Sequence, residues 1–145
     1  MGYLAAIHGF FKFFKVETSS FICEEFMSAS LDIESDWNFR VFDKRLVVVK
    51  AKNDSAHKVA VLDVVTNLPF AVEVPDTISM QELSVGKEYL ANFRVYTSKN
   101  LEGVDEDFIN FFEALDVDQS IEDFIKAYWI YPSKIRFELV DIEEP

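Results

Sequence analysis

The chain has 145 residues, of which half are hydrophobic and 15 are Phe, with only 4 Gly and 4 Pro. This composition excludes a disordered, collagen-like or low-complexity protein, and the length predicts a single domain over 1–145. Asp and Glu number 26 against 14 Lys and Arg, and the resulting net charge of −12 repels nucleic-acid backbones at long range and attracts basic partners.

Cysteine content and apolar patterning indicate where the protein resides. Cys23 is the only cysteine, so no disulfide can form within the chain and a reducing compartment is expected. The N-terminal residues lack the basic region and cleavage site of a secretory signal. No apolar run approaches the ~18 residues of a membrane span. We therefore expect a cytoplasmic protein without a membrane partner, while its oligomeric state stays open.

The first segment, 1–36, is predicted to be mainly helical. Leu4, Ile7 and Phe10 recur at helical spacing, although the same Phe-rich run also suits a strand. A second short helix is indicated between residues 21 and 31.

The middle of the chain, 37–99, is predicted to form a sheet, because apolar and polar residues alternate there with the period of a half-buried strand. Strands are expected over 37–42, 45–52, 58–66, 70–74 and 87–96. A turn is expected at Asp43-Lys44, and a capping box of Ser79 and Glu82 predicts one helical turn before the last of these strands.

The last third is predicted to be an acidic helical insertion over 101–132, followed by a closing strand over 134–143. An apolar stripe from Phe108 to Leu115 indicates one helix, and a capping box at Ser120 indicates the start of another. The fold class is therefore α+β: a small bent antiparallel sheet with an N-terminal helix and a helical insertion before the last strand.

Residues 45–99 and 134–143 resemble an OB-fold barrel. The matching pieces are a long bent strand, a hairpin through 67–69, a short helical link, and the segment from Leu83, whose Gly86 is similar to the L-x-x-G entry into a later OB strand. The resemblance implies an OB-like barrel. The long helical insertion and the acidity depart from a typical nucleic-acid-binding OB domain.

No enzymatic template is complete in this sequence. Asp63 and Glu73 lie on successive predicted strands, as in metal-dependent nucleases, but Pro75 occupies the position where such enzymes need Lys. The residues from Asp116 imitate the start of a calcium loop whose glycine position holds Ile121. We therefore predict a protein that is not an enzyme and that binds no cofactor and no metal.

The strongest candidate site is an acidic helical face within 101–125, a stretch without Lys or Arg. Its carboxylates are Glu102, Asp105, Glu106, Asp107, Glu113, Asp116, Asp118, Glu122 and Asp123. Carboxylates spaced along two helices can imitate a phosphate track and bind a basic protein. This pattern predicts a non-enzymatic interaction protein of the inhibitor, immunity or nucleic-acid-mimic type. The simpler alternative is a solvated helix face.

A second candidate site is a basic and aromatic segment that would bind single-stranded nucleic acid. Its residues are Trp37, Phe39, Arg40, Phe42, Lys44, Arg45, Lys50, Lys52 and Lys58, joined by Arg94 and Tyr96. On an OB-like sheet, each base stacked on an aromatic ring contributes about 1–3 kcal/mol. Alternatively, the aromatic residues are core and the lysines keep strand edges soluble.

A third hypothesis is a structural subunit that self-assembles through residues 1–15.

Overall fold

The computed structural model describes residues 37–113 and 121–145, so the predicted helices of 1–36 and the proposed assembly segment lie outside the described residues. The elements are β1 (Trp37–Asn53), β2 (Lys58–Asp63), β3 (Pro69–Glu73), the 3-10 helix η1 (Met80–Glu82), β4 (Glu88–Ser98), α3 (Glu106–Glu113), α4 (Ile121–Ile130), the 3-10 helix η2 (Pro132–Lys134) and β5 (Ile135–Glu143).

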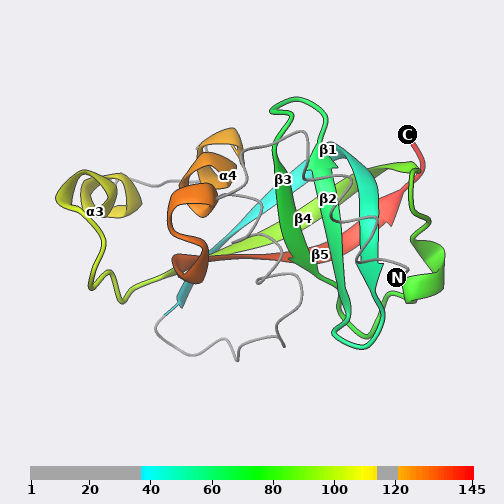
Figure 1. The fold of residues 1–145 in the computed structure, drawn as a ribbon, viewed down its shortest axis with the longest axis horizontal. Coiled ribbons are helices and arrows are strands. Elements are labelled where there is room, and N and C mark those ends of the chain that lie inside the picture. Colours follow the sequence, from blue (N-terminus) through cyan, green and yellow to red (C-terminus); the bar gives the residue numbers. More distant parts are fainter. Residues whose placement is uncertain (1–36, 114–120) are drawn as a thin grey trace.

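The five strands form a closed barrel in the order β1-β2-β3-β5-β4, with β4 pairing back onto β1 (Figure 1). Neighbouring strands are antiparallel except β3 and β5, which run parallel where Val72 faces Phe137. The expected small barrel is confirmed, and two helices do precede the closing strand.

The turn expected at Asp43-Lys44 is wrong, because β1 continues through these residues as one bent strand. The register against β4 shifts between Phe42 and Arg45, and the Lys44 backbone N–H donates to Asn92 Oδ1 at 2.7 Å. Extra residues in one strand bend it and increase its twist. As a result, the N-terminal half of β1 pairs with β4 and its C-terminal half pairs with β2, which allows the sheet to close.

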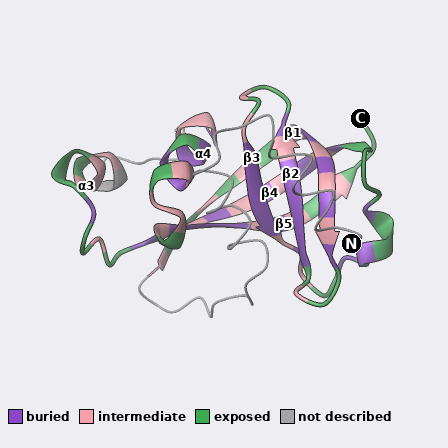
Figure 2. Cartoon of the chain, in the orientation of Figure 1, coloured by how far each residue is buried: buried purple, intermediate pink, exposed green. Residues whose placement is uncertain are grey.

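Aromatic rings fill the barrel and join it to α4. Phe70 lies 4.4 Å from Phe137 and 5.6 Å from Phe93 between ring centroids, and all three side chains are buried. The ring of Tyr128 on α4 meets Phe137 edge-on at 5.5 Å. Such pairs add about 0.5–1.5 kcal/mol each beyond the apolar area they bury. Helix α4 therefore packs on the core, with its buried side turned toward the barrel (Figure 2).

Helix α3 lies beyond α4, away from the barrel, and much of its surface is exposed (Figures 1 and 2). It is attached through aromatic contacts: Phe108 lies 4.8 Å from Tyr131, and Phe111 lies 6.4 Å from Phe124. None of the helices in the described parts of the chain is long and apolar enough to cross a membrane.

The predicted capping box before β4 is present in part. Ser79 Oγ accepts the backbone N–H of Gln81 at 3.3 Å and begins η1, although the predicted helical turn is a 3-10 turn. Ser120, the other predicted cap, lies outside the described residues.

Candidate functional site

The predicted acidic face is described in six of its nine members: Glu102, Asp105, Glu106, Asp107, Glu122 and Asp123. The side chain of Glu113, and all of Asp116 and Asp118, lie outside what the structure describes. The six do not share one role.

Asp105 is the N-terminal cap of α3. Its Oδ1 accepts the backbone N–H of Phe108 at 3.2 Å, and its Oδ2 accepts the hydroxyl of Tyr131 at 3.1 Å. The same hydroxyl oxygen accepts the Asp105 N–H at 3.1 Å. Since a side-chain cap satisfies a backbone donor that the helix leaves open, the position of Asp105 has a structural reason that needs no partner.

The first turns of both helices carry two carboxylates each, Glu106 and Asp107 on α3 and Glu122 and Asp123 on α4. Negative charge is favourable there because the helix N-terminus carries a partial positive charge. Glu122 also pairs with Lys126 at 3.2 Å. Glu106 and Asp107 are exposed, and within the described parts of the chain neither forms an ion pair. The α3 pair therefore presents to solvent two carboxylates that no described cation pairs with.

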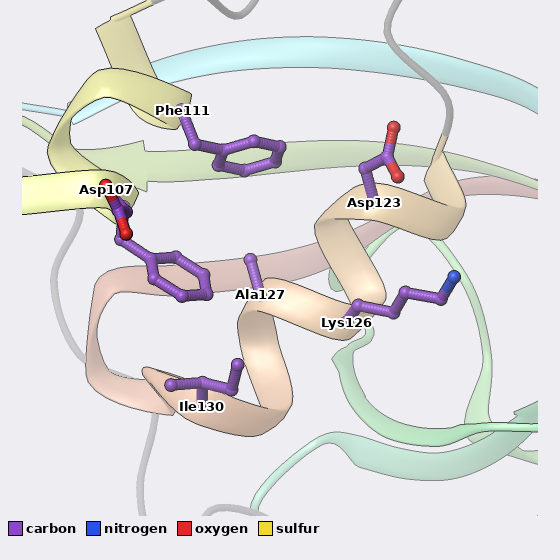
Figure 3. A pocket seen from close by; sticks show the side chains of 7 residues that line it. Asp107, Phe111, Asp123, Lys126, Ala127 and Ile130 are labelled. Carbon is purple, nitrogen blue, oxygen red and sulfur yellow. The ribbon is translucent and has the colours of Figure 1, made fainter.

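A groove of about 220 Å³ separates α3 from α4 (Figure 3). Apolar side chains form its floor: Phe108, Phe111, Ala127 and Ile130. Ile130 is 57% exposed, so it adds to the apolar surface that water reaches at this groove. The groove thus presents apolar surface to solvent on the most acidic part of the chain.

The rim of the groove is charged, with a net negative balance. Asp107 and Asp123 come from different helices and lie on opposite sides of the floor (Figure 3). The third charged residue of the rim, Lys126, is compensated by its ion pair with Glu122. The two carboxylates can attract cations to both sides of the apolar groove.

The sequence predicted the carboxylates of this region but not the groove. The signal lay in α4, where Ile130 follows the buried Ala127 at helical spacing but is itself exposed. Ile130 therefore extends the apolar face of the helix into a part that remains exposed.

The structure disperses most of the predicted basic segment. Arg45 forms an ion pair with buried Asp63 at 3.0 Å, and Lys58 is itself buried. Phe42 packs into the core, 5.1 Å from Phe124.

The remaining cations of this segment do not line up. Lys44 lies at the bulge, and Arg40 lies on the opposite face of β1 from Phe39. Lys50 and Lys52 lie on the outer face of the second half of β1, and the residues between and beside them are buried on the inner face. These cations do not form one continuous track for a phosphate backbone.

Four residues of the predicted segment come together with Arg136, which is buried, on the outer side of β1, β4 and β5. We call this group the aromatic–arginine surface: Trp37, Phe39, Arg94, Tyr96 and Arg136. Phe39 lies opposite Tyr96 across the strand pair, with ring centroids 5.9 Å apart. Arg94 Cζ lies 5.5 Å from the Phe39 ring, and Arg136 Cζ lies 6.0 Å from the Trp37 ring. Three of the predicted aromatic residues therefore do share a surface with arginine.

Both arginines of this surface have carboxylate partners. Arg94 donates to Glu138 at 3.3 Å, and Arg136 forms an ion pair with Glu73. The hydrogen bond from Arg94 to the Tyr96 hydroxyl raises the pKa of the guanidinium, against the opposing effect of partial burial. Charge on this surface is thus largely balanced within the protein.

The carboxylate pair considered for a nuclease, Asp63 and Glu73, is divided between two different ion pairs, one with Arg45 and one with Arg136. Among the described residues, no group of three or more His, Cys, Asp or Glu side chains is placed to hold a metal ion.

Comparison of the chain with protein-family models, with curated proteins and with solved structures found no match. We therefore argue its function from the surfaces of the molecule.

Proposed function

We propose that this protein is a non-enzymatic interaction protein that binds a basic macromolecule through α3 and α4, in the manner of an inhibitor, an immunity protein or a nucleic-acid mimic. The observation that carries this proposal is the groove between the two helices, which combines an apolar floor with Asp107 and Asp123 on its rim. Desolvated apolar contacts supply most binding energy at protein interfaces, while complementary charge supplies orientation and association rate.

The position of the two helices in the chain supports this proposal. We interpret the closed five-stranded barrel as an OB-like scaffold, in which the loop between the fourth and fifth strands is one of the ligand-binding loops. Helices α3 and α4 occupy that connection here, between β4 and β5. A rigid barrel that presents a binding element on an inserted loop is a common division of labour in proteins.

Binding of single-stranded nucleic acid is the second candidate function, and the aromatic–arginine surface favours it. Phe39 is 54% exposed and lies beside Arg94, an arrangement on which a base can stack. Three observations favour the first proposal over it: the arginines of this surface are paired, the net charge is −12, and the outer residues Ala60 and Ala71 of β2 and β3 are small and buried. In OB domains, the face of those two strands is the usual oligonucleotide platform.

The acidic-face proposal is tested by comparative affinity capture from a lysate with three versions of the full chain. The first is the wild type, and the second carries Glu106→Lys with Asp107→Lys on α3. The control carries Glu88→Lys with Glu143→Lys, two exposed carboxylates of the barrel, and changes the net charge equally. We expect cationic proteins that the wild type and the control retain and the α3 variant loses. Equal recovery by all three would contradict the proposal.

The nucleic-acid alternative is tested by fluorescence anisotropy of a labelled single-stranded oligonucleotide at low and at physiological salt. Saturable binding that weakens with salt and is lost in Phe39→Ala would establish the alternative, because phosphate contacts release counterions and stacked bases need the ring. Absence of binding at low salt would eliminate it.

A further inference from the structure

We propose that the groove between α3 and α4 receives one bulky apolar side chain of the basic partner, with cationic residues of the partner on both sides of that side chain. This inference rests on the proposed function and adds the chemistry of the segment that is bound. It follows from the volume of the groove, the nature of its floor and the placement of its carboxylates.

The volume limits what can enter. A cavity of about 150 Å³ admits a benzene ring, and sites for drug-sized ligands span about 300–1,000 Å³. The groove, at about 220 Å³, lies between these values. It therefore suits a single aromatic or large aliphatic side chain and is too small for a cofactor or for several anchors of a long helix.

The floor suits an apolar anchor. The rings of Phe108 and Phe111 meet edge-on with centroids 6.2 Å apart, one helical turn from each other on α3. Ala127 faces them from α4, and its small side chain helps to leave the space open (Figure 3). Ile130 exposes more than half of its surface at the other end of the slot. A bound apolar side chain would remove this surface from water.

The carboxylates determine what flanks the anchor. Because Asp107 and Asp123 lie on opposite sides of the floor, a segment that crosses the slot passes one carboxylate before its anchor and the other after it (Figure 3). Lys126 pairs with Glu122 and extends away from Asp107 (Figure 3), so it does not offset the carboxylate on the α3 side. Asp107, Glu122 and Asp123 together outnumber this one cation, so the rim stays negative on balance. An acidic segment would be repelled at both sides. A second copy of this chain, with a net charge of −12, is disfavoured for the same reason.

The test titrates three short peptides into the isotopically labelled full chain and follows backbone amide shifts by NMR. The first peptide has one Trp between two Lys-Arg pairs, the second replaces the Trp by Ser, and the third replaces one Lys-Arg pair by Ser-Ser. We expect the first peptide to shift the amides of Ala127 and Ile130, and to bind about tenfold or more tightly than the second, since burial of an aromatic side chain is worth at least that factor. The third peptide should bind several-fold more weakly than the first.

Two variants test whether the apolar side chain of the peptide binds in the groove. Both replace exposed apolar side chains, so neither should destabilise the fold. Ile130→Ser removes part of the slot and should weaken the first peptide several-fold while leaving the second unchanged. Val65→Ser, which alters a residue that is 68% exposed in the β2–β3 turn, should change neither.

The outcomes separate the inference from the function on which it rests. If the Trp and Ser peptides bind equally and both are lost in the variant with Glu106→Lys and Asp107→Lys, the anchor is refuted and the acidic docking face remains. If the first and third peptides bind equally, the two-sided cation pattern is refuted. If no peptide shifts the amides of α3 or α4, the inference is refuted, and the proposed function then stands or fails on the capture experiment with the Glu106→Lys and Asp107→Lys variant.

Discussion

The ion pair between Arg45 and Asp63 offers the sharpest test of how this barrel is held together. Asp63 is completely buried, and the Arg45 guanidinium hydrogen-bonds both of its carboxylate oxygens. Nε donates to Oδ2 at 3.1 Å and Nη2 donates to Oδ1 at 3.0 Å. The backbone N–H of Thr66 donates to the same Oδ1 at 2.9 Å, so the carboxylate also organises the turn between β2 and β3. Removing Arg45 would leave a buried carboxylate whose side-chain oxygens, among the described residues, keep only the hydrogen bond from Thr66.

The expected loss of stability differs between the two partners because Asp63 is fully buried and Arg45 is partly exposed to water. Arg45→Met strands a carboxylate that is fully buried, and we expect a loss of about 3–5 kcal/mol in the free energy of unfolding. Asp63→Asn should cost less, about 2 kcal/mol, because the amide oxygen still accepts the Thr66 N–H and charged hydrogen bonds are worth about 1.5–3 kcal/mol. The Arg45 side chain, at 21% exposed, can also hydrate in part. The double variant carries no unpaired charge, so its loss should be smaller than the sum of the two single losses by at least about 1 kcal/mol.

The measurement is urea unfolding followed by circular dichroism. With a slope of about 2 kcal/mol per molar urea, Arg45→Met should lower the midpoint by roughly 2 M while leaving the slope unchanged. Lys44→Met is the matched control, because it removes a neighbouring exposed cation for which no ion pair is seen among the described residues; its effect should stay within about 0.5 kcal/mol. A loss below about 1 kcal/mol for Arg45→Met, or strict additivity in the double variant, would show that the buried carboxylate does not depend on Arg45.

Three further predictions concern the core, a helix cap and an exposed ion pair. Phe137→Ala should cost about 3–5 kcal/mol by calorimetry, because it opens a cavity among the barrel rings, whereas a cost near 1 kcal/mol would mean that the core collapses to fill it. Asp105→Ala should cost about 1 kcal/mol and speed amide hydrogen exchange in α3 but not in the barrel; unchanged exchange in α3 would show that the cap is dispensable. The hydrogen bond to Glu144 raises the pKa of Lys87, so its contribution to stability is present below the unfolded-state pKa and is lost as pH rises through the folded-state value. An NMR titration of Lys87 should show the pKa falling in Glu144→Gln, and an identical titration in both proteins would contradict the assignment.

Local pattern was sufficient for the positions of most described strands and of both described α-helices, because each obeys a period that burial on one face imposes. The alternation over 37–42 and 87–96 became β1 and β4, and the apolar stripe near Phe108 became α3. The acidic character of the helical insertion was also visible in the sequence, because it depends only on which residues are present.

The groove could not be predicted in the same way. Its floor joins Phe111 on α3 to Ala127 and Ile130 on α4, and a pattern along one helix does not say which face of a second helix it will meet. Only the packing of α3 beyond α4 brings these apolar side chains together, with Asp107 and Asp123 on two sides of them.

The sequence alone was sufficient for the charge balance, for a small barrel and for the positions of most described strands and helices. The pairing between distant residues depended on the tertiary structure. Asp43 and Lys44 suit a turn or a bulge equally well, and the pairing of β1 with Asn92 on β4 made them a bulge. Arg45 looked like one more surface cation until the register of β1 and β2 placed it beside Asp63. The physical reason is that periodicity reports burial along one element, whereas register and ion pairing depend on how separate elements meet in space.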